Sequence, residues 1–371
     1  MAPKKRVSQS CYERQASIVG KDQVPKAVTC NVDVRWPDWC NCWSDLWPFF
    51  LLMACTKEHP SDQCAGPGYP SPMHAFRHGP REKILYVTTV SLGEGPDNLV
   101  VVDVDPSSEN YGKIVRKLAM PFAGDELHHF GWNSCSSCYD DTDCERNKMV
   151  LPCLNSDRIY VVEVDRVTGL DMKIVKIIDD LPSKMKVSAP HTAHCAPDKS
   201  VMVSCMGDES GHGKGSIIRM SGQNLSSLSH WTTDHSDFGY DFWYQPRHNV
   251  LITSEWGSPN AWKRGLNGQD LAAGNYGHSI HIYEWTSGKR LQTIDLGKED
   301  GLMPLEVRFL HDPQKAHAFV GCAFSSSVFH IFRTDDGTEW RADKIIQVAR
   351  KKVRNWLFDY MPGKKQMTKS T

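Results

Sequence analysis

Short β-rich segments follow one another along this 371-residue chain from about residue 84 onward, and they constrain its fold more than any other feature. Gly, Pro, Asp and Asn separate the segments, and almost no helical periodicity lies between them. Strands at this spacing are typical of an all-β fold. The expected strands are 84–90, 99–104, 149–154, 158–164, 173–178, 201–206, 215–220, 250–256, 278–285, 290–296, 318–323 and 328–333.

A faint internal repeat indicates how these strands are grouped. The sequence Val101–Asp105 (VVDVD) recurs 60 residues later as Val161–Asp165 (VVEVD). Repeats of roughly 50–60 residues, each holding about four strands, are typical of propeller blades. From residue 64 onward the chain has room for about five blades. A pair of β-sandwiches is the alternative fold, but it would not explain the repeat.

The charge and hydropathy of the chain argue against several classes of protein. Its 43 Lys and Arg nearly balance 44 Asp and Glu, which argues against a protein that binds nucleic acid by neutralising phosphates. The longest apolar run, Leu46–Cys55, contains Pro48 and is shorter than the roughly 20 residues of a membrane helix. We expect a soluble intracellular chain without a nucleic-acid partner. In a reducing compartment its 13 cysteines would be metal ligands, redox groups or buried apolar residues.

One stretch of 14 residues, which ends at Cys138, concentrates side chains suited to metal and redox chemistry. It contains Glu126, the adjacent pair His128 and His129, and Cys135 three residues before Cys138. Imidazole and thiolate suit copper or zinc. On a regular strand adjacent histidines point to opposite faces, so only one of this pair would face a given site. We expect metal or redox use of this stretch, with a structural zinc held by the two cysteines and two histidines as the alternative.

A second histidine cluster, His191 and His194 beside Cys195, follows about one repeat later. Because equivalent strands of a propeller approach the same axis, residues one repeat apart can meet there. Later repeats add three axial candidates, Glu255, Glu306 and His311. The predicted metal ligands are His128, His129, His191, His194 and His311, and the candidate catalytic carboxylates are Glu126, Glu255 and Glu306.

Long strings of residues resemble a known family. They are 66–69 (GPGY), 79–82, 125–138 (DELHHFGWNSCSSC), 191–195 (HTAHC), 239–249, 254–256, 304–311 (PLEVRFLH), 319–323 and 344–348. Over about residues 53–363 the chain resembles the selenium-binding protein family, now understood as methanethiol oxidases. The resemblance implies a seven-bladed propeller that uses copper and O2 to oxidise methanethiol, a small thiol, to formaldehyde, hydrogen sulfide and hydrogen peroxide.

The resemblance also carries roles to particular residues of this chain. It implies that His128, His129, His191 and His194 form the copper site, and that Cys135 and Cys138 are the redox pair that binds selenium. The alternative is a non-catalytic selenium-binding propeller in intracellular protein transport. The family's association with the cytosol, the nucleus and the periphery of membranes is expected to extend to this chain.

Three segments differ in their relation to the family. Residues 1–52 are expected to be a poorly ordered N-terminal extension, 53–363 a partial propeller domain, and 364–371 a divergent tail. The last third of the family's sequence has no counterpart after 363. With about five of seven blades the ring would stay open, so we expect self-association through its open edge and impaired oxidase activity.

Overall fold

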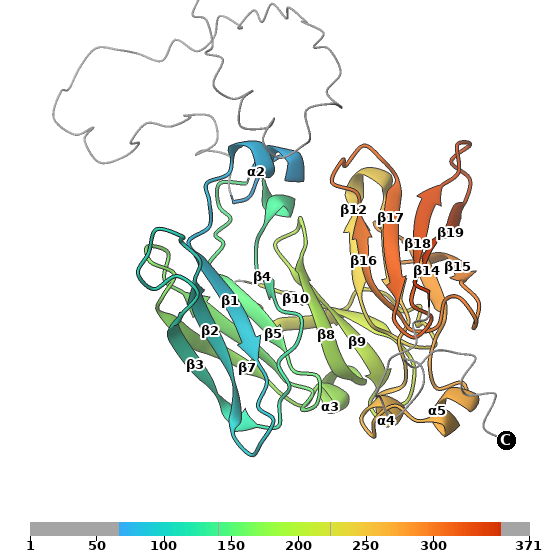
Figure 1. The fold of residues 1–371 in the computed structure, drawn as a ribbon, viewed down its shortest axis with the longest axis horizontal. Coiled ribbons are helices and arrows are strands. Elements are labelled where there is room, and N and C mark those ends of the chain that lie inside the picture. The colour runs from blue at the N-terminus through green and yellow to red at the C-terminus, as the bar shows by residue number, and fades with distance from the viewer. Residues whose placement is uncertain (1–66, 140, 223, 350–371) are drawn as a thin grey trace, which may run out of the picture. The chain divides into compact units, whose positions relative to one another are not determined.

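The computed structural model describes residues 67–349 with the exception of 140 and 223 (Figure 1). The predicted extension 1–52 and tail 364–371 lie outside the described residues. Within the described part, five antiparallel sheets follow one another in chain order, the first with three strands and the others with four. No helix in this part is long and apolar enough to cross a membrane.

The five sheets are numbered here in chain order. Sheet 1 contains β1 (Ile84–Thr89), β2 (Pro96–Asp103) and β3 (Ile114–Ala123). Sheet 2 contains β4 (Gly131–Trp132), β5 (Lys148–Pro152), β6 (Ile159–Val164) and β7 (Met172–Ile178). Sheet 3 contains β8 (Val187–Cys195), β9 (Val201–Asp208), β10 (Ser216–Ser221) and β11 (Ser227–His230).

The last two sheets repeat the same order. Sheet 4 contains β12 (Phe242–Gln245), β13 (Val250–Ser254), β14 (Ser279–Glu284) and β15 (Arg290–Asp295), and sheet 5 contains β16 (Pro304–Phe309), β17 (His317–Cys322), β18 (Ser327–Arg333) and β19 (Trp340–Gln347). The helices are short: α2 (Pro72–His78), η2 (Ser136–Cys138), α3 (Leu181–Met185), η3 (Pro246–His248), α4 (Pro259–Trp262) and α5 (Gly268–Ala272).

Neighbouring sheets share buried apolar clusters, so the core runs from one sheet to the next. Leu99 of sheet 1 belongs to a cluster with Met149 of sheet 2, and Val161 of sheet 2 to one with Val203 of sheet 3. Further clusters join sheets 3 and 4, and sheets 4 and 5. In Figure 1 the colour accordingly passes from sheet to sheet along the chain. The prediction of an all-β propeller architecture is confirmed.

The first strands of the sheets face one another where functional side chains gather. β4 contacts β8, β12 contacts β16, and His129 forms a parallel bridge with Thr192 of β8. Sheet 1 differs, because its strand β2 carries the VVDVD sequence that matches β6, the third strand of sheet 2. β1 therefore takes the second position, and no described strand pairs with its other edge.

A recurring backbone feature, a residue with positive φ, lies near the start of three of these first strands. Glu126, Ala189 and Met303 have positive φ angles of 56°, 50° and 58°, which few residues other than glycine adopt. A nearby backbone N–H in turn donates to an aspartate that belongs to the preceding sheet, to a loop within it, or to the segment just before it. The bonds are Leu127 N to Asp97 Oδ2 (2.7 Å), Ala189 N to Asp157 Oδ1 (2.6 Å) and Val307 N to Asp241 Oδ2 (2.8 Å). These bonds tie the segment before β4, the start of β8 and the interior of β16 to the preceding part of the chain.

Candidate functional site

Three histidines from two sheets meet at the first strands. His128 and His129 lie just before β4, and His191 lies on β8. One ligand nitrogen of each lies within 4.8 Å of the others. The ring centroids are 4.6 Å apart for His128 and His129, and 4.3 and 4.7 Å from these two to His191. The structure therefore brings together the two histidine clusters that the repeat related.

Local backbone irregularity explains why adjacent histidines can share this site. His128 and His129 are not on a regular strand, so the expectation that only one of them would face the site is wrong: both rings belong to the group. On β8, pairing with β9 shifts between Pro190 and Ala193, where one extra residue forms a bulge. The bulge alters the usual alternation along the strand.

The group is electrostatically suited to ligation. Burial, helped by His129, lowers the pKa of His128 to about 4. Burial first, and then its histidine neighbours, lower the pKa of His191 well below the usual range. His128 Nδ1 and His191 Nε2 are buried without a hydrogen-bond partner among the described residues, while His191 Nδ1 lies 2.7 Å from the Thr192 hydroxyl. The imidazoles of His128 and His191 are thus neutral at pH 7 and keep lone pairs for a ligand.

A cavity of about 290 Å³ opens beside the group. It is lined by Thr88, His128, His129, Phe130, Thr192, Ala193, His194 and Arg308. Burial, and then Arg308, lower the pKa of His194 to about 3, and its ring packs edge-on against Trp243 at 4.4 Å. The predicted ligand His194 therefore lines the cavity beside His129 without belonging to the close group of three.

Glu306 lies at the edge of the same site. Its Oε1 is 3.8 Å from His129 Nε2, and its side chain is 34% exposed. Behind the group, the ring of Tyr240 lies 3.9 Å from that of His191. Burial, followed by the charge of Glu306, raises the pKa of the Tyr240 phenol. Glu306 is thus the one candidate carboxylate that contacts a histidine of the group.

The cysteines are arranged differently from the predicted redox pair. Cys135 forms a disulfide with Cys195, the last residue of β8, rather than with Cys138. Cys138 is buried, and its Sγ lies 3.8 Å from the carbonyl oxygen of Ala196. Among the described residues the metal-binding group contains no cysteine, so the structure does not bring together the four ligands of the zinc alternative.

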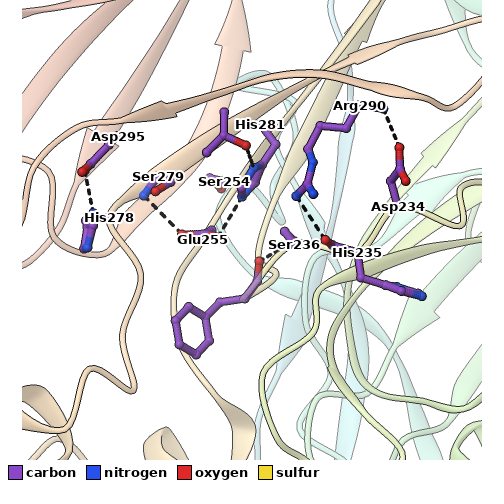
Figure 2. A network of polar contacts seen from close by, with 12 residues as sticks. Asp234, His235, Ser236, Ser254, Glu255, His278, Ser279, His281, Arg290 and Asp295 are labelled. Carbon is purple, nitrogen blue, oxygen red and sulfur yellow. Dashed lines mark hydrogen bonds and ion pairs between the residues drawn. The ribbon is translucent and has the colours of Figure 1, made fainter.

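The remaining predicted residues lie outside the three-histidine group. Glu126 accepts a hydrogen bond from Asn155 at 2.6 Å, and burial raises its pKa. Glu255 is buried and pairs with His281 at 2.8 Å within a network in and around sheet 4 (Figure 2). His311 is exposed after the end of β16. Their predicted roles in ligation or catalysis have no support from contacts with the group.

Sequence reasoning assigned no role to Arg308 and Asp241, although both lie in strings that resemble the family. Asp241 is 1% exposed, and its Oδ2 is 2.7 Å from Arg308 Nη1. Their pairing joins the segment before β12 to β16, so it depends on contact between two sheets. The only signal in the sequence was the length of the matching strings.

Comparisons with known proteins bear on the family. The sequence model of the family described as "56kDa selenium binding protein (SBP56)" matches residues 63–366. A protein named methanethiol oxidase from Danio rerio is 47% identical over 308 residues, which are 80% of this chain and 66% of that protein. "Selenium-binding protein 2" from Mus musculus is 44% identical over 320 residues, which are 84% of this chain and 65% of that protein.

A solved structure agrees with these matches. The X-ray structure of a hypothetical selenium-binding protein from Sulfolobus tokodaii superimposes with a TM-score of 0.72 at 36% sequence identity, and the match covers 77% of this chain and 65% of that one. The chain spans about two thirds of the length of these relatives.

Proposed function

The chain belongs to the 56-kDa selenium-binding protein family, and on that premise we propose that it is a copper-dependent oxidase of a small thiol. Methanethiol, O2 and water would give formaldehyde, hydrogen sulfide and hydrogen peroxide. The observation that carries the proposal is the group of three histidines, His128, His129 and His191, whose ligand nitrogens lie within 4.8 Å of one another. Relatives that are named methanethiol oxidase support the choice of substrate.

The donor set of the group fits copper. Imidazole is a ligand that suits copper, and a ligating histidine must be neutral. The buried nitrogens His128 Nδ1 and His191 Nε2 lack hydrogen-bond partners among the described residues, and leaving a buried polar atom unpaired is costly. A bound metal would remove that cost. The hydroxyl of Thr192, next to Nδ1 of His191, would fix the orientation of that ring, as outer partners of metal ligands do.

The chain's own residues would bind and orient the reactants. When bound, copper would supply the electron transfer to O2 that acid–base side chains cannot perform. The cavity of about 290 Å³ is at the low end for small-molecule sites, which suits a one-carbon thiol. Phe130 and Ala193 give it an apolar wall, while Glu306, 3.8 Å from His129, can accept a proton at Oε1.

The proposal is tested with purified protein, copper and methanethiol. Hydrogen peroxide and hydrogen sulfide are the products to be measured, together with copper per chain. The double substitution His128→Ala, His191→Ala should abolish both products and copper binding. His212→Ala is the matched control, because His212 is 72% exposed and lies outside the group. Equal product from the double variant and the wild type would rule out this site for the reaction.

A second candidate function is favoured by the proximity of three cysteines. Cys135 is bonded to Cys195, and Cys138 lies beside Ala196. We propose as the alternative a non-catalytic selenium-binding module in protein transport; the cysteine arrangement and relatives named selenium-binding protein support its selenium-binding part. Cys135→Ser with Cys138→Ser should then abolish retention of radiolabelled selenite, and the histidine variants should retain it. Loss of retention in both sets of variants would count against a separate module.

The location of the protein in the cell is part of the same proposal. We expect the cytosol and the nucleus, with reversible binding to membrane surfaces. Imaging of a fluorescent fusion, together with salt extraction of the membrane fraction, tests this expectation. A signal confined to a sealed organelle, or one that only detergent releases, would contradict it.

A further inference from the structure

We propose that Arg308 binds the substrate as a thiolate and so selects small alkyl thiols against sulfur compounds that cannot ionise. This inference rests on the proposed function, since it concerns the same cavity. The cavity is lined by three histidines, and Arg308 is the one lysine or arginine among its lining residues. Because a guanidinium stays protonated at any ordinary pH, Arg308 is the permanent cation that a bound anion meets in this cavity.

Three contacts hold the guanidinium in place. Arg308 Nη1 donates to Asp241 Oδ2 at 2.7 Å and to its neighbour's carbonyl, Val307 O, at 2.6 Å. The guanidinium carbon lies 4.8 Å from the ring centroid of Trp243, a cation–π distance. Asp241 is in turn fixed by the backbone N–H of Val307 at 2.8 Å. A guanidinium fixed before binding loses little conformational entropy when an anion arrives.

The remaining donors of this guanidinium are available. Both hydrogen bonds of Arg308 use Nη1, and within residues 67–349, 140 and 223 apart, neither Nη2 nor Nε has a hydrogen-bond partner. The side chain is 46% exposed, whereas that of Asp241 is fully buried. Arg308 therefore faces its counter-ion on one side and keeps donors for a ligand on the other.

The chemistry of thiols makes this cation selective. The thiolate, rather than the thiol, is the nucleophile and the metal ligand. A cation within about 4–6 Å of an acid favours its ionised form, so Arg308 favours binding of the fraction already ionised in solution, whose proton stays in bulk water. A thioether has no acidic proton and cannot use this interaction. Glu306 places a negative charge nearby, which makes a fixed cation more necessary for an anionic ligand.

The first test compares Arg308→Gln with Arg308→Lys. Loss of a charge-assisted hydrogen bond should raise the KM for methanethiol about 10- to 100-fold in Arg308→Gln, with copper per chain unchanged and kcat changed less than about 3-fold. Lysine keeps the charge and should restore most of the affinity. Arg219→Gln is the matched control, because Arg219 also pairs with an aspartate, Asp198, at 2.8 Å, and lies outside the cavity. An unchanged KM in Arg308→Gln, or loss of copper from it, would overturn the proposal.

A second test does not depend on turnover. Thiocyanate, a small sulfur anion, should bind metal-free wild-type protein, as followed by the NMR line width of the labelled ion. The affinity should fall about 10-fold or more in Arg308→Gln and stay unchanged in Arg219→Gln. If the wild type does not oxidise methanethiol but thiocyanate binding still depends on Arg308, the oxidase proposal fails and the anion site stands. Equal affinity in wild type and Arg308→Gln overturns the anion site itself.

A third test uses the wild-type protein alone and remains informative if Arg308→Gln does not fold. Thiocyanate should compete with methanethiol for the active protein, and dimethyl sulfide should not compete at the same concentrations. Competition by dimethyl sulfide as strong as that by thiocyanate would show that charge does not govern selection.

Discussion

Replacing Cys135 with serine is expected to lower the free energy of unfolding by about 4 kcal/mol in oxidising buffer. The disulfide joins Cys135 to Cys195, 60 residues apart in sequence. In the chain-entropy model, closing a loop of that length in the unfolded chain stabilises the folded state by about 4 kcal/mol. Serine is close to cysteine in size and Cys135 is partly exposed, so changes in packing should contribute little.

The magnitude separates this pairing from a disulfide between Cys135 and Cys138, the two cysteines for which the sequence predicted a redox role but no particular bond. A bond between Cys135 and Cys138 would close a loop of only about three residues, which the same model values at about 1.5–2 kcal/mol. The contribution of a disulfide to the free energy of unfolding therefore differs between a bond across two sheets and a bond within one turn. The difference exceeds the usual uncertainty of an unfolding measurement.

Guanidinium unfolding of wild type, Cys135→Ser and Cys144→Ser, with and without reductant, provides the assay. Reductant should destabilise the wild type by about 4 kcal/mol and leave Cys135→Ser unchanged. Cys144→Ser removes a cysteine without removing the disulfide, so it should respond to reductant as the wild type does. Peptide mapping without reductant identifies the bond directly. If wild type and Cys135→Ser unfold at the same midpoint in oxidising buffer, the reasoning is refuted.

Three further outcomes are expected. Asp125→Asn should lower the free energy of unfolding by about 3–5 kcal/mol in calorimetry, because Asp125 is fully buried and its Oδ1 lies 2.6 Å from Arg158 Nη1. A loss as small as that of the exposed control Asp171→Asn would contradict this. Leu85 is 51% exposed on the unpaired edge of β1, so Leu85→Lys should weaken the expected self-association and shift the sedimentation coefficient toward that of the monomer. The prediction fails if the control Leu291→Lys, on β15, has the same effect. Copper at 100 times its dissociation constant should add about 2.7 kcal/mol to stability and a chelator should remove it, whereas a melting temperature indifferent to both would exclude a bound metal.

Strands of the sheet interiors were predictable, and the first strands were not. β6 (IYVVEV) and β9 (VMVSCMGD) are rich in β-branched and other apolar residues that predict strands directly. β8 contains Pro190 and the polar residues of the site, and β4 has only two residues, so neither shows strand periodicity. Strands that face the site carry the residues that the site needs, and those residues hide the pattern.

The site was predictable to the same limited extent. The repeat related His128 and His129 to His191 correctly, and the three rings lie together. Their role as copper ligands stays a prediction. The bond from Cys135 to Cys195 depends on how β8 ends beside the segment after β4, which no local pattern records. A pair of cysteines three residues apart is a stronger signal in sequence than a pair 60 apart, so the sequence suggested a role for Cys135 and Cys138 and gave no sign of the bond to Cys195.

The parallel bridge between His129 and Thr192 has a consequence for biosynthesis. The three histidines meet once sheets 2 and 3 have formed, but Arg308 of sheet 5 is translated 117 residues after His191, the last of the three. At about 5–20 residues per second this delay is roughly 6–23 s. A ribosome-bound chain arrested between sheets 3 and 5 should therefore bind a metal ion but not thiocyanate, so that the growing protein acquires its affinity for the ion before its selectivity for the substrate.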